Sequence, residues 1–513
     1  MRIRGAAILA VLSAFAPACG GGGSGGGGLP LVFTALTPVD TSAPDHVVDT
    51  SKAPDVITGQ LQGFFDLGGT IVFNNAGPVT IGVTAELELK ANKTVVLDGK
   101  NTVTLAGSIA PVRRIIHKKF DSELTIQRLK FVDARADDEG GALRVEGGDG
   151  KLTVIDCQFQ NCKTVNTGHD IGGGALRPLR QRLCQVSGST FTDCDGSNGG
   201  AINSIGSQIT LIKCVFDQCD AFGTGGGADA GGNGGIGGAV YADGVHQLAN
   251  QPRLDVVGCS FTNNTAKDHG GAIFAFTYAG TGSNVFIDQC AFSGNQVTSP
   301  PTPVAGLGGA IYHQNNTITV TRSTFDGNKT IKQGGAVWSS CVFGTFENCT
   351  FQGNQATGSP GFGGALTING SFLISSCTIA GNTAAGWGGG IFAGSPGNVA
   401  LRNSLLMNNT GVDLGNGWNV NATLGGGWSN LQWPPTRGGG GPADTPALAS
   451  VTFANANLSA LADNGGTPMI PLKTMAIAPP SPAVDAGSSA PATDQRGETR
   501  LAAPDIGAFE FKP

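Results

Sequence analysis

Small and hydrophobic residues recur along the chain in a fixed order, nine times between residues 140 and 393. Each copy has two glycines, an alanine (glycine in the last copy), an aliphatic residue, a variable residue and usually a small or apolar one. This alternation places the aliphatic and final residues of a strand on one face and the variable residue on the other. The copies start at Gly140, Gly173, Gly199, Gly237, Gly270, Gly308, Gly334, Gly363 and Gly388. Their spacing of roughly 25 to 38 residues predicts a solenoid with one coil per copy.

A second phrase, Phe-x-x-Asn or Phe-x-x-Cys, follows each glycine pair. Equivalent side chains in a parallel stack lie ~4.8 Å apart, so each position of the phrase predicts a ladder along the axis. The Phe position is filled by Phe159, Phe191, Phe216, Phe261, Phe292, Phe325, Phe351, Ile379 and Leu406. The third position after it is Asn264, Asn295, Asn328, Asn354, Asn382 and Asn409 in the later copies. We expect a buried phenylalanine ladder and a structural asparagine ladder at a turn.

The segment before the repeats predicts an N-terminal cap. Val56, Leu61, Phe64, Phe65 and Leu67 have approximate helical spacing, ended by two glycines. A short helix here would cover the open end of the solenoid. Strands are expected over the ranges 69–74, 79–89, 93–98, 102–106, 113–117 and 123–132.

The two phrases together resemble the polymorphic outer membrane protein repeat, over about residues 140 to 409. This resemblance implies an all-β fold, a right-handed parallel β-helix of the pectate-lyase-like kind. After residue 411 the period stops. Phrases such as Asp463-Asn464-Gly465-Gly466 and Asp505-Ile506-Gly507-Ala508-Phe509-Glu510 resemble the choice-of-anchor Q region of bacterial surface β-helix proteins. Such a region would finish the solenoid and cover its last rung.

The chain therefore divides into five parts. Residues 1–19 have the character of an export signal, 20–54 of a glycine-rich tether and linker, 55–135 of a cap with the first coils, 136–411 of the repeats and 412–513 of a closing region. Ala16-Pro17-Ala18-Cys19 resembles a lipoprotein signal, in which Cys19 is lipidated; the alternative is simple secretion. A membrane contact is expected only through this anchor. The net charge of −6 without a basic block argues against nucleic acid, and a monomer is expected.

Cysteines occupy two columns of the repeat. Small residues, either Cys or Ser, stand two places before the Phe position, which indicates a small buried group. In three consecutive copies Cys162, Cys194 and Cys219 replace the asparagine. The α-carbons of equivalent residues in neighbouring coils lie within the distance range that a disulfide accepts, and an exported protein enters a compartment where disulfides can form. We predict one bond, either Cys162–Cys194 or Cys194–Cys219.

The variable residue after the aliphatic one is the candidate contact surface. It reads Arg144, Arg177, Asn203, Tyr241, Phe274, Tyr312, Trp338, Thr367 and Phe392. Four consecutive coils thus present aromatic rings on the outside of the strand. A flat row of rings could hold a polysaccharide; alternatively, the rings only shield the sheet. Glycan binding by Tyr241, Phe274, Tyr312, Trp338 and Phe392, with Arg144 and Arg177, is the leading hypothesis.

An enzyme on the same scaffold is the alternative. Asp137, Asp138 and His269 lie too many coils apart, ~19 Å, to share one substrate. Arg144 and Arg177 have only Glu146 and Asp149 nearby, so we expect solvated surface charges. The histidines at 117, 169, 246 and 313 show no partner at ligand spacing. Asp485, Asp494, Arg496 and Glu510 could form a catalytic cluster, but salt bridges and turns of a cap are favoured.

The sequence thus predicts an exported, surface-displayed, non-catalytic binding protein, adhesin-like, with polysaccharide or cell-surface glycan as its partner. A polysaccharide lyase or glycoside hydrolase remains the rival interpretation. No metal or cofactor is expected; calcium would enter only with a lyase, and the glycine-rich stretch 225–238 is taken as a surface excursion.

Overall fold

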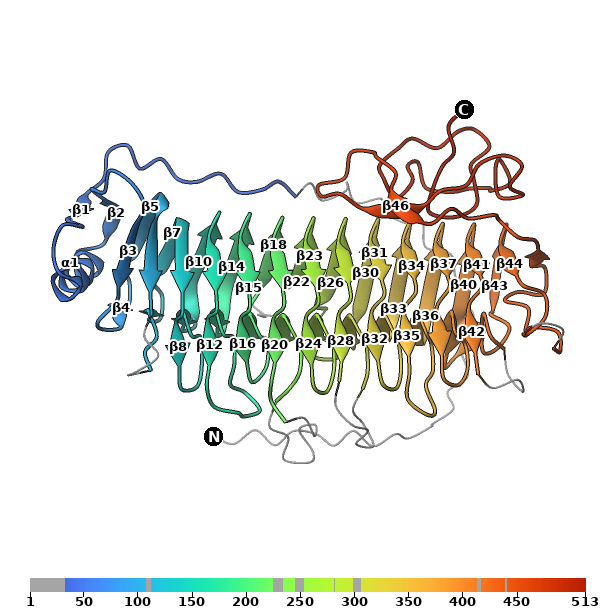
Figure 1. Ribbon diagram of the computed structural model, residues 1–513, viewed down its shortest axis with the longest axis horizontal. Helices are drawn as coiled ribbons and strands as arrows, with labels where there is room; N and C mark the ends of the chain where they lie inside the picture. Colours follow the sequence, from blue (N-terminus) through green and yellow to red (C-terminus); the bar gives the residue numbers. More distant parts are fainter. Residues whose placement is uncertain are drawn as a thin grey trace.

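The chain folds into a right-handed parallel β-helix of about 13 turns, which forms a long rod (Figure 1). The computed structural model describes residues 33–107, 112–224, 234–244, 253–280, 282–298, 306–412, 417–438 and 441–513. The export signal, Cys19 and His246 lie outside these residues. A complete coil has four short strands, and each strand pairs in parallel with its equivalent in the next coil. The predicted fold is confirmed.

The strand that follows the glycines comes first in each coil, and two equivalent strands precede the first glycine copy. These first strands are β4 (Leu87–Leu89), β6 (Ile116–Lys118), β9 (Leu143–Val145), β13 (Leu176–Pro178), β17 (Ile202–Ile205), β21 (Val240–Asp243), β25 (Ile273–Phe276), β29 (Ile311–Gln314), the start of β33 (Val337–Glu347) and of β36 (Leu366–Ser375), and β39 (Ile391–Ala393). The second strands are β1 (His46–Val48), β2 (Gly69–Phe73), the start of β5 (Thr94–Ala106) and of β7 (Glu123–Val132), β10 (Gly148–Ile155), β14 (Gln181–Ser187), β18 (Ile209–Ile212), β22 (Arg253–Val257), β26 (Asn284–Asp288), β30 (Thr317–Thr321), the ends of β33 and β36, β40 (Val399–Arg402) and β43 (Gly426–Trp428).

The third strand carries the Phe position. These strands are β3 (Val79–Gly82), the ends of β5 and β7, β11 (Gln158–Gln160), β15 (Thr190–Thr192), β19 (Val215–Asp217), β23 (Ser260–Thr262), β27 (Ala291–Ser293), β31 (Thr324–Asp326), β34 (Thr350–Gln352), β37 (Thr378–Ala380), β41 (Leu405–Met407), β44 (Leu431–Trp433) and β45 (Thr452–Phe453). The fourth strands form a ten-stranded sheet of two-residue strands: β8 (Arg135–Ala136), β12 (Lys163–Thr164), β16 (Asp195–Gly196), β20 (Asp220–Ala221), β24 (Thr265–Ala266), β28 (Gln296–Val297), β32 (Lys329–Thr330), β35 (Gln355–Ala356), β38 (Thr383–Ala384) and β42 (Thr410–Gly411).

The two glycines of each copy have different tasks. The first glycine has a positive φ between 54° and 69° in all nine copies, a conformation that a side chain disfavours. A Cβ on the second glycine, as at Gly238, would overlap the carbonyl oxygen of Gly271 in the next coil. The alanine that follows is buried in all eight copies that have one. The motif is therefore required by the corner at which the first strand begins.

The phenylalanine ladder fills the axis of the rod. Eight rings from Phe131 to Phe351 are fully buried, and consecutive centroids lie 4.6 to 4.9 Å apart with nearly parallel planes. Phe131, at the end of β7, extends the predicted ladder by one coil. Ile379 and Leu406 continue it in β37 and β41 with no exposed surface. Complete removal of such rings from water stabilises the rod along its length.

The asparagine ladder provides hydrogen bonds to the backbone at the turn that follows the third strand. Nδ2 of Asn295 donates to the carbonyl oxygen of Phe261 in the preceding coil and to Oδ1 of Asn328 in the next coil, both at 2.9 Å. The same pair of bonds recurs from Asn264 to Asn382. The ladder ends on a buried carboxylate, because Asn419 donates to Oδ2 of Asp444. Both predicted ladders are confirmed.

The helix α1 (Pro54–Leu67) closes the N-terminal end (Figure 1). It buries Ile57, Leu61 and Phe65, whereas Val56 and Leu67, which we had counted on the apolar face, are exposed. Two strand predictions were also inaccurate: the range 79–89 is divided into β3 and β4, and the ranges 93–98 and 102–106 form one strand, β5.

Residues 33–44, assigned to a linker, instead lie along the rod. Figure 1 shows this strap running beside the second strands from β5 toward the middle of the molecule. The backbone N–H of Val39 donates to Gln127 and that of Leu36 donates to Ser187, at 2.8 and 3.0 Å. The strap reaches Phe286, on which Phe33 stacks at 5.7 Å.

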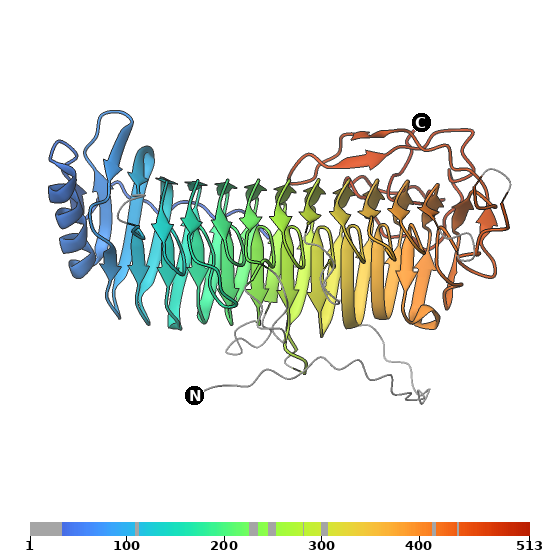
Figure 2. The ribbon, with the colours of Figure 1, turned by 60° about the horizontal axis from the view of Figure 1, so that its bottom comes forward.

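The closing region divides into two parts. Residues 417–453 complete the last coils with β43, β44 and β45. Residues 454–513 turn back and lie along the same edge of the rod as the strap (Figures 1 and 2); they include β46 (Leu461–Asp463) and β47 (Lys473–Met475), which pair antiparallel. Residues 417–453 thus finish the solenoid as expected, whereas residues 454–513 lie along the side of the rod. The short 3-10 helix η2 (Pro396–Asn398) lies before β40.

Candidate functional site

The variable positions of the first strands form one outward-facing column, as the alternation predicts. We call it the outer column, and it includes one residue that the sequence analysis missed, His117 in β6. Register places His117 beside Arg144, Arg144 beside Arg177, and Asn203 beside Tyr241. A second line of residues, directly before the glycines, runs next to it and includes Glu139, His269 and Phe362.

The N-terminal part of the outer column is a network of ion pairs. We call it the charged cluster; its members are Glu86, Arg114, His117, Asp138, Glu139, Arg144, Glu146 and Arg177. Four carboxylates from neighbouring coils thus converge. The expectation that only Glu146 and Asp149 lie near Arg144 and Arg177 was wrong, because coil stacking places Glu139 beside both arginines.

His117 lies between two carboxylates of the charged cluster. Its Nδ1 is 3.2 Å from Oε1 of Glu86, and its Nε2 is 2.9 Å from Oε1 of Glu146. Carboxylates only accept, so both contacts are hydrogen bonds when the ring carries both protons. Burial alone would raise the pKa of Glu86, but the hydrogen bond with His117 and the charge of Arg114 outweigh burial and lower it. His117, which we had called partnerless, is thus the centre of the cluster.

The two arginines of the column are not solvated surface charges. Arg177 is 1% exposed, and its Nη2 lies 3.1 Å from Oε1 of Glu139. Burial lowers the pKa of Arg177, and the charge of Glu139 opposes that shift. Arg144 is partly exposed and lies 3.3 Å from Oε2 of the same carboxylate. Glu139, which precedes the first glycine pair, therefore holds both guanidinium groups.

The aromatic part of the outer column is stacked and largely buried. Tyr241, Phe274 and Tyr312 are 2%, 7% and 5% exposed, and Trp338 is half-buried. Consecutive ring centroids from Tyr241 to Trp338 lie 5.1, 4.8 and 4.7 Å apart. The expectation of an exposed, flat row of rings was wrong, because each ring covers the face of its neighbour.

Residues of the second line contribute to this burial. His269 stacks on Tyr312 at 4.8 Å, and Gln333 accepts a 3.1 Å hydrogen bond from Nε1 of Trp338. Phe392 is separated from the stack by Thr367 and stacks instead on Phe362, at 4.9 Å. The stack stabilises the outside of the rod in the way the phenylalanine ladder stabilises its inside.

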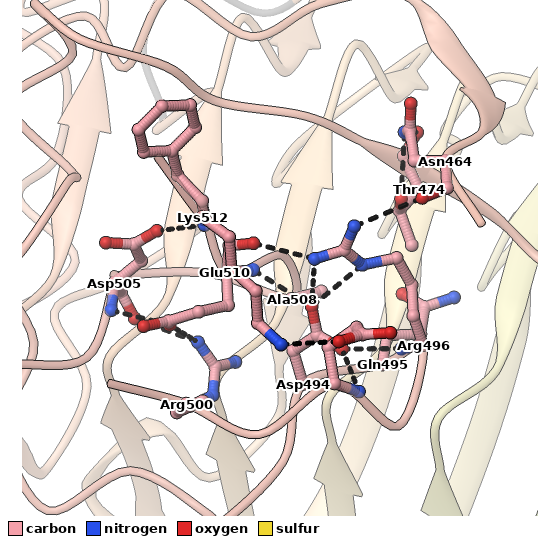
Figure 3. A network of polar contacts seen from close by, with 12 residues as sticks. Asn464, Thr474, Asp494, Gln495, Arg496, Arg500, Asp505, Ala508, Glu510 and Lys512 are labelled. Atoms are coloured by element: carbon pink, nitrogen blue, oxygen red, sulfur yellow. Dashed lines mark hydrogen bonds and ion pairs between the residues drawn. The ribbon is translucent and has the colours of Figure 1, made fainter. Parts of the chain in front are cut away.

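The acidic and basic residues of the closing region form a second network (Figure 3). Arg496 donates from Nε and Nη2 to Oδ2 of Asp494, at 2.9 and 2.7 Å. Arg500 donates to Oε2 of Glu510 at 3.0 Å, and Asp494 and Glu510 have no exposed surface. Asp485 lies at a turn with a φ of 55°, and its backbone N–H donates to Asp505. The carboxylates of Asp494 and Glu510 are thus bonded to residues of the same region, which supports the favoured structural interpretation.

The same network attaches the closing region to the rod. Arg500 donates to Oδ1 of Asn348 at 3.0 Å, and Oγ1 of Thr350 donates to Gln495 at 2.6 Å. Asn403 bonds twice with the backbone of Ser488, at 2.7 and 2.9 Å. The region is therefore fixed to the rod by buried polar bonds.

The three cysteines of the asparagine column lie on consecutive coils, as predicted, but all are free thiols. Each thiol contacts the carbonyl oxygen of the Phe position in the preceding coil: Cys162 with Phe131, Cys194 with Phe159 and Cys219 with Phe191, at 3.6 to 3.8 Å. The thiol thus takes the place of the asparagine amide. The predicted disulfide is not formed in the structure.

The other cysteine column has a related task. The backbone N–H of Cys214 points at Sγ of Cys259 at 3.3 Å, and that of Cys157 donates to Oγ of Ser189 at 3.1 Å. The position therefore requires a small side chain that can accept a hydrogen bond.

His313 lies inside the rod with Nδ1 3.0 Å from Oγ of Ser339, and burial lowers its pKa to about 3. In the described part of the chain, no group of three or more His, Cys, Asp or Glu side chains is arranged to hold a metal ion. None of the helices in the same part is long and apolar enough to span a membrane.

Comparisons with known proteins agree with this architecture. Residues 114–341 match the model of the right handed beta helix region, and residues 376–394 match the Chlamydia polymorphic membrane protein repeat. The chain is 34% identical over 165 residues to the probable outer membrane protein pmp6 of Chlamydia pneumoniae, and 27% identical over 248 residues to the metabotropic glutamate receptor-like protein R of Dictyostelium discoideum.

These stretches cover 26% and 46% of this chain, but only 12% and 13% of the two relatives. The matches support the resemblance to polymorphic membrane protein repeats and to right-handed β-helices.

Proposed function

We propose that the protein is a surface-displayed, non-catalytic binding protein, adhesin-like, whose partner is a polysaccharide or cell-surface glycan. The observation that carries the proposal is the repeat itself, which this chain shares with a protein named as a probable outer membrane protein. A rod with internal ladders along its axis is suited to holding an extended partner, because equivalent positions repeat at one strand spacing of ~4.8 Å.

The buried ring faces of the outer column are not available as the contact surface for a glycan. Tyr241, Phe274 and Tyr312 are assigned to stability, and Trp338, Phe392 and Arg144 are the members of the former site that keep accessible surface. Retention of the purified full chain on insoluble polysaccharides, without release of reducing ends, is the expected result. Absence of retention on every polysaccharide of a neutral and acidic panel would contradict the proposal.

We also propose that export ends with lipidation of Cys19. Thirteen residues, 20–32, separate this cysteine from Phe33, which lies near the middle of the rod. Through the strap, the anchor would be attached near the middle of the rod and not at one of its ends. Metabolic labelling with a fatty acid, lost in a Cys19→Ser variant, tests the anchor.

One observation favours an enzyme as the second candidate: His117 is held between Glu86 and Glu146 from different coils. Such a set could transfer a proton during cleavage of a polysaccharide. Release of reducing or unsaturated ends, measured with and without calcium and lost in His117→Asn, would support a glycoside hydrolase or lyase. Product release that is equal in the wild type and the variant would exclude a role of His117 in it.

A further inference from the structure

A cleft of about 430 Å³ lies where the closing region meets the rod. Its rod side is built by the ends of β34, β37 and β41, and its other side by residues 455–458 and the end of β47. This volume lies within the range of roughly 300 to 1,000 Å³ that small-molecule sites occupy. The cleft exists only because residues 454–513 turn back along the rod.

The polar lining of the cleft consists of primary amides. Gln352, Asn408, Asn455 and Asn457 line it, and none of the nine lining residues is charged. Within the described residues, the side-chain amides of Gln352, Asn408 and Asn457 have no hydrogen-bond partner in the protein, whereas Oδ1 of Asn455 accepts from the backbone N–H of Asn457. Each free amide offers two donors and an acceptor in one plane.

The apolar lining comes from Met407, Leu458 and Met475. Met407 belongs to a small core beneath the closing region, and the other two pack against that core. Thioether and aliphatic side chains form an adaptable surface for C–H groups. Free amides around an apolar floor match a pyranose ring, whose hydroxyls lie at its edge and whose C–H groups lie on its faces.

We propose that this cleft is a binding site for a neutral oligosaccharide. The inference rests on the proposed function and assigns the place of the glycan contact to the seam between rod and closing region. The absence of charged side chains from the lining favours neutral sugars over uronic acids, because a carboxylate there would lose water without gaining a cation.

The backbone of the rod supplies native-like variants for the test. Asn408 and Asn457 have positive φ values of 54° and 52°, so glycine removes each amide without strain. Glycine already fills the position of Asn408 in the four preceding coils, at Gly294, Gly327, Gly353 and Gly381. The triple variant Gln352→Ala, Asn408→Gly, Asn457→Gly therefore leaves Asn455 as the one amide side chain in the lining. The matched control is Gln160→Ala with Asn263→Gly, which changes the same two columns on coils outside the cleft.

Calorimetric titration of the full chain with cellohexaose, mannohexaose, chitohexaose and hexagalacturonate provides the measurement. We expect at least one neutral hexasaccharide to bind, with affinity reduced about tenfold or more in the triple variant, as loss of several hydrogen bonds implies, and unchanged in the control. Circular dichroism and the melting temperature verify that both variants fold.

Binding of neutral sugars that is equal in wild type and triple variant would overturn the cleft and leave the proposed function intact. Binding of hexagalacturonate alone would do the same. If none of the four probes binds, the cleft is excluded as a neutral-sugar site, while retention on insoluble polysaccharide decides the proposed function separately.

Discussion

The backbone N–H of Cys219 donates a 3.0 Å hydrogen bond to Oδ1 of Asn264, the next residue of the same column. At this junction a thiol ladder of three coils passes into an amide ladder of six. Both side chains reach the carbonyl oxygen of the Phe position one coil earlier, at 3.7 Å for the thiol and 3.1 Å for the amide. Cysteine and asparagine are therefore two solutions to one hydrogen-bonding requirement.

This equivalence predicts an order of stability at Asn295. Asn295→Ala removes the side-chain donor to the carbonyl of Phe261 and the acceptor for the N–H and one Nδ2 hydrogen of Asn264, whose Nδ2 keeps its bond to Phe216, at a cost of about 3 kcal/mol. Asn295→Cys keeps a contact to the carbonyl, as at Cys219, and should cost clearly less. Midpoints of denaturant unfolding measure the difference, and equal midpoints for the two variants would contradict the equivalence.

The thiols give a second prediction. All eleven cysteines from Cys157 to Cys377 are free and buried, so eleven thiols of this segment should react under denaturing, non-reducing conditions. In the native state labelling should be slow, since burial raises the pKa of Cys157 and of Cys184 to about 12. Cys341, with 8% exposure and a pKa raised by burial to about 11, should react first. A count of nine reactive thiols would instead support one disulfide among Cys162, Cys194 and Cys219.

The repeat predicts those features that recur in every copy, and it does not predict contacts that arise only when the coils stack. Phe159 and Asn295 could be placed because each recurs at a fixed offset from the glycines. His117 could not, because Glu86 precedes the first glycine copy and its contact exists only through coil stacking. Its signal was the position itself: Ile116, His117 and Lys118 repeat the in–out–in order of Leu143, Arg144 and Val145.

The burial of Tyr312 and the path of the closing region could not be predicted for the same reason. The alternation of apolar and variable residues correctly placed Tyr312 on the outer face of its strand. It does not show whether neighbouring rings and His269 bury the side chain there. The closing region has no sequence repeat, so the sequence did not predict that residues 454–513 turn back along the rod. The amide-lined cleft depends on that return and could not be found from Gln352 or Asn457 alone.

The burial of the outer column changes what a substitution at Tyr312 should do. Its ring contacts Phe274, Trp338 and His269, so Tyr312→Ala is expected to lower the stability by about 3 to 5 kcal/mol. Tyr312→Phe preserves the stack and should be much milder. Phe343→Ala is the matched control, because that ring is 47% exposed. An Ala variant at Tyr312 as stable as the control would indicate that the stack contributes little.

Lys118 makes the stability of the rod depend on pH. The side chain is fully buried at an inward position, its Nζ donates to Gln181 at 3.1 Å, and burial lowers its pKa to about 8 from 10.5. Below pH 8 both the folded and the unfolded state hold the proton, and the folded state carries the full cost of a buried charge. Between about pH 8 and 10.5 only the unfolded state holds it, so stability contributed by this group rises with pH.

Lys118→Met should therefore stabilise the protein at pH 7 by a net ~1–2 kcal/mol, after subtraction of the bond to Gln181. The gain should shrink as the pH approaches 10.5. Free energies of unfolding at pH 7 and 10 provide the measurement, and Lys130→Met, at a partly exposed position of β7, is the control. A gain of equal size at both pH values would argue against titration of Lys118 as its cause.

The attachment of the closing region depends on Arg500. This side chain joins Glu510, which has no exposed surface, to Asn348 on the rod, at 3.0 Å in both cases. Arg500→Met leaves the carboxylate of Glu510 buried without its cation, at a cost of about 3 to 5 kcal/mol.

Because residues 454–513 add no rung to the phenylalanine ladder, the loss of Arg500 should detach this region and leave the rod folded. Limited proteolysis should then cleave within residues 454–513 and spare the described strands of the rod. Lys512→Ala, which removes an exposed pair with Glu498, should leave the cleavage pattern of the wild type. Proteolysis of both parts at one rate would show instead that rod and closing region unfold as one unit.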